Sequence, residues 1–155
     1  MDIALPSLLR RIYGEVADGG FGPNGCRFFP VGHFHEDESE TIVTAYAQVT
    51  DPGAGEPWPR CLVPFAVFKK AWMCLDCRSV EGNILIPSGY GEDDSTVFMS
   101  TDRDLESWLR AWLSSVDLAA EMFEPERNET VLDPFTKRMK TITVCKPRGR
   151  VVSVA

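Results

Sequence analysis

The chain has 155 residues, of which 44% are hydrophobic. This suits one domain with its own core, and no apolar run approaches the roughly 20 residues that span a bilayer. Residues 1–126 hold 21 acidic and 9 basic residues, a net charge of −12, whereas residues 127–155 hold 7 basic and 2 acidic residues, a net charge of +5. The acidic body disfavours nucleic acid and anionic membranes as partners, because both are negatively charged.

The first predicted element is an amphipathic helix over residues 6–18. Pro6 suits the first turn, where its missing N–H costs nothing, and Gly19 and Gly20 follow where a left-handed helix end favours glycine. Phosphate-binding loops precede a helix, so this glycine-rich turn is not predicted to bind phosphate. The N-terminus also lacks the basic region and apolar core of a signal peptide, and we expect a cytoplasmic protein. The apolar stripe of the helix is Leu5, Leu8, Leu9, Ile12, Tyr13 and Val16.

The next two elements are a short strand and an ambiguous segment. Residues 27–31 indicate an edge-like strand, because Pro30 limits its ladder hydrogen bonds. The β-branched content of residues 41–49 favours a strand, but their apolar side chains recur at helical spacing. As a helix, this segment has Ser39 or Thr41 as a candidate N-cap.

The centre of the chain is predicted to form most of the sheet. Residues 51–59 are dense in proline and glycine and indicate a loop. Residues 36–40 and 88–95 indicate two acidic loops. Strands are predicted over residues 61–68, 72–77, 83–86 and 96–100.

Helices and one strand are predicted in the last third. Thr101 or Asp102 is a good N-cap for a helix with the stripe Leu105, Trp108, Leu109, Trp112 and Leu113, which places both tryptophans in the core. Residues 118–123 continue as a shorter helix that Pro125 ends, and residues 141–145 form a final strand. The sequence therefore predicts a single α+β domain over residues 1–155, with a mainly antiparallel sheet of about five to six strands flanked by helices and a basic C-terminal segment over residues 127–155.

Cysteine and histidine residues offer a possible metal or redox site. A redox Cys74-x-x-Cys77 pair needs its first thiol at a helix N-terminus, but the neighbouring residues favour a strand, whose two thiols point to opposite faces. A zinc site needs four ligands, and Cys74 and Cys77 with His33 and His35 form one candidate set. The alternative is that these thiols are buried core residues, as unpaired cysteines often are. We prefer this alternative and predict no metal and no cofactor. The five cysteines, an odd number, also fit reduced thiols better than a disulfide framework.

Catalytic chemistry has little support in the sequence. There is no G-x-S-x-G motif, and a pair of Cys26 with His33 or His35 requires a proximity that the sequence does not indicate. The carboxylates cluster in polar loops, where no desolvation raises the pKa of a general acid. We therefore predict that the protein is not an enzyme.

Two acidic loops and one tryptophan are the candidate partner-binding residues. The carboxylates of the two loops either contact a basic protein partner or only increase the solubility of the protein. Trp58, between two prolines, either anchors a partner or folds back onto the core. The basic C-terminal segment is a local binding surface or, as we prefer, a terminal strand with solvated basic side chains. The predicted partner-binding residues are Glu36, Asp37, Glu38, Trp58, Glu92, Asp93 and Asp94.

Five stretches in order resemble the SUKH superfamily, which contains bacterial toxin-immunity proteins and fungal cell-wall assembly regulators. They are Leu5-Pro6 through Gly19-Gly20-Phe21-Gly22-Pro23, Trp58-Pro59 with Leu62-Val63-Pro64, Cys74-Leu75-Asp76-Cys77, Leu105-x-x-Trp108-Leu109-x-x-Trp112-Leu113, and Asp133-Pro134-Phe135-Thr136. The resemblance implies a helix over residues 41–49 and a core strand at Cys74. The chain departs from it at Phe68-Lys69-Lys70-Ala71, where many relatives carry a D-W-G-like turn.

This resemblance implies a non-enzymatic immunity protein that binds and blocks a cognate toxin. A toxin that acts on nucleic acid has a basic cleft, and the acidic loops could then imitate phosphates and speed association. The alternative is an intracellular regulatory or scaffold protein of the cell-wall-regulator type. The oligomeric state is not indicated by the sequence.

Overall fold

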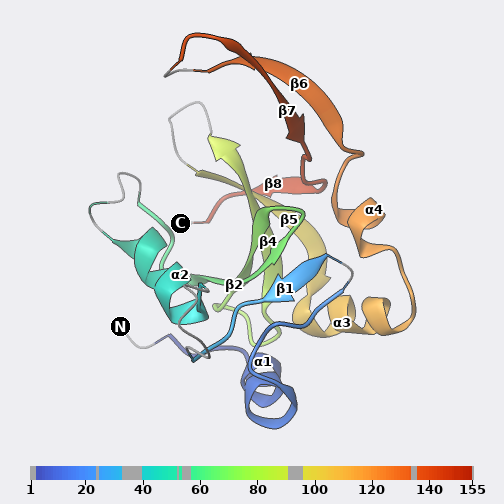
Figure 1. The fold of residues 1–155 in the computed structure, drawn as a ribbon. Helices are drawn as coiled ribbons and strands as arrows, with labels where there is room; N and C mark the ends of the chain where they lie inside the picture. The colour runs from blue at the N-terminus through green and yellow to red at the C-terminus, as the bar shows by residue number, and fades with distance from the viewer. Residues whose placement is uncertain are drawn as a thin grey trace.

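The computed structural model describes residues 3–23, 25–32, 40–51, 53, 57–90, 96–133 and 136–154, which form one α+β domain. Six antiparallel strands make the main sheet in the order β1-β2-β3-β4-β5-β8, and β6 and β7 form a separate two-stranded sheet (Figure 1). The fold class predicted from the sequence is confirmed. The strands are β1 (Cys26–Phe28), β2 (Leu62–Phe68), β3 (Ala71–Asp76), β4 (Asn83–Tyr90), β5 (Thr96–Asp104), β6 (Arg127–Leu132), β7 (Met139–Val144) and β8 (Arg150–Val152).

The helices gather against one face of the main sheet, where the larger core lies. Alternating residues of the central strands, such as Met73 and Leu75, point into this core, as side-chain alternation requires. Cys74, between them, belongs to a smaller cluster with Leu62, Leu85 and Phe98. The helices are α1 (Ser7–Arg11), continued by the π-helical turn η1 (Ile12–Val16), α2 (Ile42–Thr50), α3 (Leu105–Leu113) and α4 (Leu118–Met122).

The N-terminal helix is confirmed, but its last turn differs from the prediction. Leu9 and Ile12 are buried, whereas Val16, assigned to the apolar stripe, is 72% exposed. The cause is the π-helical hydrogen bonding of η1, which changes the angular spacing of its side chains. Gly19 and Gly20 then adopt φ values of 77° and 76°, as expected for a glycine-rich helix end.

Residues 42–50 form a helix, which decides the ambiguous segment. Thr41 caps it: its Oγ1 accepts a hydrogen bond from the Thr44 N–H at 3.0 Å, and the Thr44 side chain accepts one from the Thr41 N–H at 2.8 Å. Ile42 and Ala45 are buried against the sheet. Local capping thus agrees with the helical spacing of the apolar residues.

Helix α3 begins later than predicted. Strand β5 continues through Asp104, and Asp102 has a left-handed φ of 56°, so neither Thr101 nor Asp102 caps the helix. Asp104 is the N-cap, and its carboxylate accepts the Ser107 N–H at 2.7 Å. Trp108 is fully buried. Leu113 is 78% exposed, because five residues at about 100° each place it about 140° around the helix from Trp108.

The C-terminal strands are the largest departure from the prediction. The strand predicted over residues 141–145 is β7, but it pairs with β6 rather than with the main sheet. The sixth strand of the main sheet is β8, which pairs with β5. Ser88, Gly89 and Tyr90, predicted as loop, extend β4 instead. These strands are short or mostly exposed, so the hydrophobic alternation that predicts strands is weak there.

Candidate functional site

The predicted acidic site falls outside the part of the chain that the structure describes. So do His33 and His35, and the zinc set is therefore untested. The second group of carboxylates lies in the connection from β4 to β5. The partner-binding carboxylates affected are Glu36, Asp37, Glu38, Glu92, Asp93 and Asp94.

Trp58 folds back onto the smaller hydrophobic cluster. Its indole N–H donates to the Leu62 carbonyl oxygen at 2.9 Å, and its ring meets Phe98 edge to face, with ring centroids 5.2 Å apart. The side chain is half-buried. Of the two interpretations, capping the core therefore describes its contacts, and a partner-binding role stays a prediction.

The cysteines are thiols without disulfide bonds. Cys74 lies in the smaller cluster, whereas Cys77 packs against the main core, so the two thiols do face opposite sides of the sheet. Burial raises the pKa of Cys74 far above that of a free thiol and the pKa of Cys77 to about 12. Both groups are therefore protonated at neutral pH and are poor nucleophiles. No group of three or more potential metal ligands gathers among the described residues.

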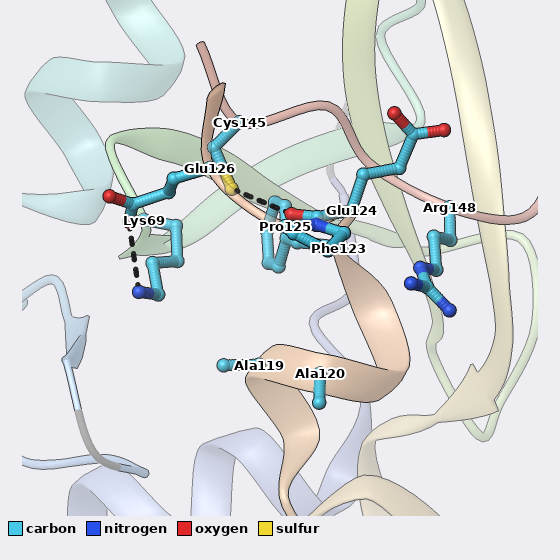
Figure 2. Close-up of a pocket in the computed structure, with 9 residues that line it drawn as sticks. All are labelled: Lys69, Ala119, Ala120, Phe123, Glu124, Pro125, Glu126, Cys145 and Arg148. Carbon is cyan, nitrogen blue, oxygen red and sulfur yellow. Dashed lines mark hydrogen bonds and ion pairs between the residues drawn. The ribbon is translucent and has the colours of Figure 1, made fainter. Parts of the chain in front are cut away.

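An open hollow lies where the β6–β7 hairpin leaves the body, next to the turn between β2 and β3 (Figure 2). We call it the hairpin groove. Its volume is about 290 Å³, and a second hollow of about 360 Å³ shares Lys69, Glu126 and Cys145 with it. The hairpin groove is lined by Lys69, Ala119, Ala120, Phe123, Glu124, Pro125, Glu126, Cys145 and Arg148.

Backbone hydrogen bonds hold the stem of the hairpin against the end of α4. The Glu124 N–H donates to the Lys146 carbonyl oxygen at 2.8 Å, and the Arg148 N–H donates to the Met122 carbonyl oxygen at 2.7 Å. Phe123, buried in the main core, forms an isolated bridge with Pro147. The groove therefore has a fixed stem beneath a projecting hairpin.

Lys69, which shares a strained turn with Lys70, forms the wall opposite the stem. Lys69 and Lys70 have φ values of 50° and 66°, as in the two-residue hairpin turns that usually favour asparagine or glycine. The Lys69 ammonium lies 3.0 Å from the Glu126 carboxylate, which joins this turn to the start of the hairpin. Both partners are substantially exposed, so the ion pair adds little stability, and its main effect is to orient the two side chains.

The thiol in the groove is suited to packing rather than to reaction. Burial, and then the charge of Glu126, raise the pKa of Cys145, while Lys69 opposes this effect. The Sγ atom lies 3.6 Å from the Glu124 carbonyl oxygen, as Figure 2 shows. A protonated thiol beside apolar carbon and exposed charges offers a binding surface, not a nucleophile.

Comparisons with protein-family models, with curated proteins and with solved structures found no match for this chain. Among the described residues, no helix has the length and apolar character that crossing a membrane requires. A function must therefore be inferred from the surface of the protein itself.

Sequence reasoning did not identify the residues of the hairpin groove. Phe123, Cys145 and Arg148 come from segments with no recognisable motif, and only the hairpin brings them together. One signal was present: the change from an acidic to a basic chain at Arg127 coincides with the first residue of β6. A second was the Lys69-Lys70 turn, where the chain departs from the pattern that it otherwise resembles.

Proposed function

We propose that this chain is a non-enzymatic, cytoplasmic binding protein of the SUKH kind, which neutralises a cognate bacterial toxin by covering its active site. The observation that carries the proposal is the separation of charge, −12 over residues 1–126 and +5 over residues 127–155. The α+β framework supports it, because the residues that resemble the superfamily include structural positions of this fold. Gly19 is one: a Cβ atom there would come within 2.6 Å of the Pro30 nitrogen.

The mechanism is electrostatic attraction followed by steric blocking. A toxin that cleaves or modifies nucleic acid presents a basic cleft, and a body of charge −12 raises the rate of encounter with it. Carboxylates of the two acidic loops then take the places of substrate phosphates. Such an inhibitor needs no reacting group, since occupying the cleft is sufficient.

The proposal is tested by expressing the C-terminal domain encoded by the gene immediately upstream, first alone to establish its toxicity and then together with this protein. We expect the protein to restore growth and to form a tight one-to-one complex, measured by calorimetry at several salt concentrations. Two sets of carboxylate-to-amide changes should weaken the complex and flatten its salt dependence. The first set is Glu36→Gln, Asp37→Asn and Glu38→Gln, and the second is Glu92→Gln, Asp93→Asn and Asp94→Asn.

A matched control removes the same charge from exposed sites on other elements. Glu15→Gln, Glu81→Gln and Glu106→Gln together change the net charge as much as either loop set, and all three residues are exposed. If this triple weakens the complex as much as the loop variants do, net charge alone is responsible and the loops are not the contact. If the toxin is unaffected by co-expression, the proposal fails, and a regulatory or scaffold role becomes the better hypothesis.

A further inference from the structure

The β6–β7 hairpin projects from the body (Figure 1), and the residues on one of its faces are all exposed. Because directly paired residues point to the same side, the register places Leu132 with Met139, Thr130 with Thr141 and Asn128 with Thr143 on one face. All six side chains are exposed and uncharged. We call them the outer face. The opposite face carries the charges of Arg127, Glu129 and Lys140.

A two-stranded sheet has backbone N–H and C=O groups along both outer edges that no neighbouring strand pairs with. The extensive contacts of β6 and β7 are with each other, and within the described chain neither strand pairs with a third. Isolated hairpins are marginally stable, and unpaired strand edges are available for pairing with another chain. Leu132 and Met139 are 57% and 65% exposed and form an apolar pair at the far end. These features are typical of a surface that a partner covers.

Positive charge lies at both ends of the outer face. Five exposed cations of this segment form no ion pair with any described residue. Two of them, Lys137 and Arg138, lie in the turn beside the apolar pair. The others are Lys140, on the opposite face, and Lys146 and Arg148, which follow the end of β7. At the stem, Thr143 of the outer face lines the hollow of about 360 Å³ together with Lys69 and Lys70.

We propose that the outer face and this adjoining hollow bind an acidic, extended segment of a partner protein. Charge complementarity identifies the occupant: carboxylates meet Lys137, Arg138 and Lys70, while apolar side chains of the segment cover Leu132 and Met139. The free strand edges supply backbone hydrogen bonds for an added strand, a recurrent mode of peptide recognition. The cations beside this surface are opposite in sign to the net charge of the body, and this inference does not depend on the toxin proposal.

A nucleic acid fits this surface less well. The outer face offers threonines and an apolar pair rather than cations, and the acidic body repels phosphates. A second copy of the chain also fits less well, because six residues of a hairpin offer far less than the roughly 800 Å² per partner of a stable interface.

Nuclear magnetic resonance with defined peptides tests the proposal. The probe is a blocked peptide of alternating glutamate and valine, and the control probe alternates lysine and valine. We expect the acidic peptide to shift the amide signals of Thr130, Thr141 and Thr143, and the basic peptide to leave them unchanged. Lys137→Glu with Arg138→Glu should weaken this binding about fivefold or more. Arg10→Glu with Arg60→Glu, an equal change of charge at exposed sites elsewhere, should not.

Each other outcome overturns the proposal. Equal shifts with both peptides, or none, would mean that charge does not select the occupant. Tighter binding of a short DNA duplex at the same amides would assign the surface to nucleic acid. Shifts that depend on protein concentration alone would assign it to a second copy. The amide signals of β2 and β3 must stay unchanged in both double variants, which shows that the body remains folded.

Discussion

Gly149 packs so closely against Ser100 that a Cβ atom on Gly149 would overlap the Ser100 carbonyl oxygen. Gly149 also has a φ of 128°, a conformation that other residues rarely adopt. Directly after it, Arg150 pairs with Ser100 as β8 joins the edge of the main sheet. The return of the chain from the hairpin to the body therefore depends on a residue without a side chain.

Gly149→Ala should destabilise the protein by about 2–4 kcal/mol, because backbone strain and overlap with the Ser100 carbonyl group act together. Gly20→Ala is the matched control: its φ of 76° is also positive, but nothing lies within 4 Å of its Cβ position. We expect Gly20→Ala to cost only about 1 kcal/mol, from strain alone. Urea unfolding followed by circular dichroism measures both values, and equal losses would contradict the overlap.

Trp108→Phe should destabilise the domain by about 1–3 kcal/mol. The Trp108 side chain is fully buried, packs edge to face on Phe65, and directs its indole N–H to the Met122 sulfur atom at 3.1 Å. The smaller ring leaves a cavity and removes this contact. Trp112→Phe, at a half-buried position on the same helix, should cost clearly less. Similar losses in urea unfolding would mean that burial does not separate the two tryptophans.

The sequence predicted those elements in which several local signals agree. In the segment 42–50, the apolar spacing and the capping residues Thr41 and Thr44 favour the same helix. The central strands were recognised because burial on both faces gives continuous apolar runs. Pro64 and Pro87 lie in interior strands, although proline has no backbone N–H to donate to the neighbouring strand. The register shifts next to each of them, and at such an irregularity the missing donor is tolerated.

The predictions that failed concern features that the local sequence pattern does not encode, chiefly contacts between residues distant in sequence. β7 was recognised as a strand, but nothing local indicates that it pairs with β6 rather than with the main sheet. The exposure of Val16 follows from one π-helical turn, which leaves no signature in the residue pattern. The hairpin groove unites the β2–β3 turn with α4 and the hairpin stem, so its composition emerges only from tertiary structure.

Stability should fall as the pH rises from about 8.5 toward 12. Burial raises the pKa of Cys26 to about 12, whereas an unfolded thiol titrates near 8.5. The unfolded state therefore binds fewer protons in this window, so stability is complete below it and is lost through it. Cys77 and the partly buried hydroxyl of Tyr13 also have raised pKa values and act in the same direction. In reducing buffer, Cys26→Ala should reduce the decline of the urea midpoint between about pH 8 and 10, and an unchanged decline would contradict this origin.

Lys70→Gly should be more stable than Lys70→Ala by about 0.5–1 kcal/mol. A left-handed conformation costs a residue with a Cβ atom about 1–2 kcal/mol of stability, and glycine avoids this strain. The greater conformational freedom of glycine in the unfolded chain offsets about 0.4–1 kcal/mol of that advantage. Both changes remove the same charge from the wall of the hollow, so both should weaken binding of the acidic peptide equally. If Lys70→Gly is more stable than Lys70→Ala but binds the acidic peptide less tightly than the unchanged protein, then Lys70 adopts a strained backbone conformation at a position where its charge contributes to binding. Equal stability of the two variants in urea unfolding would mean that the turn stores no strain.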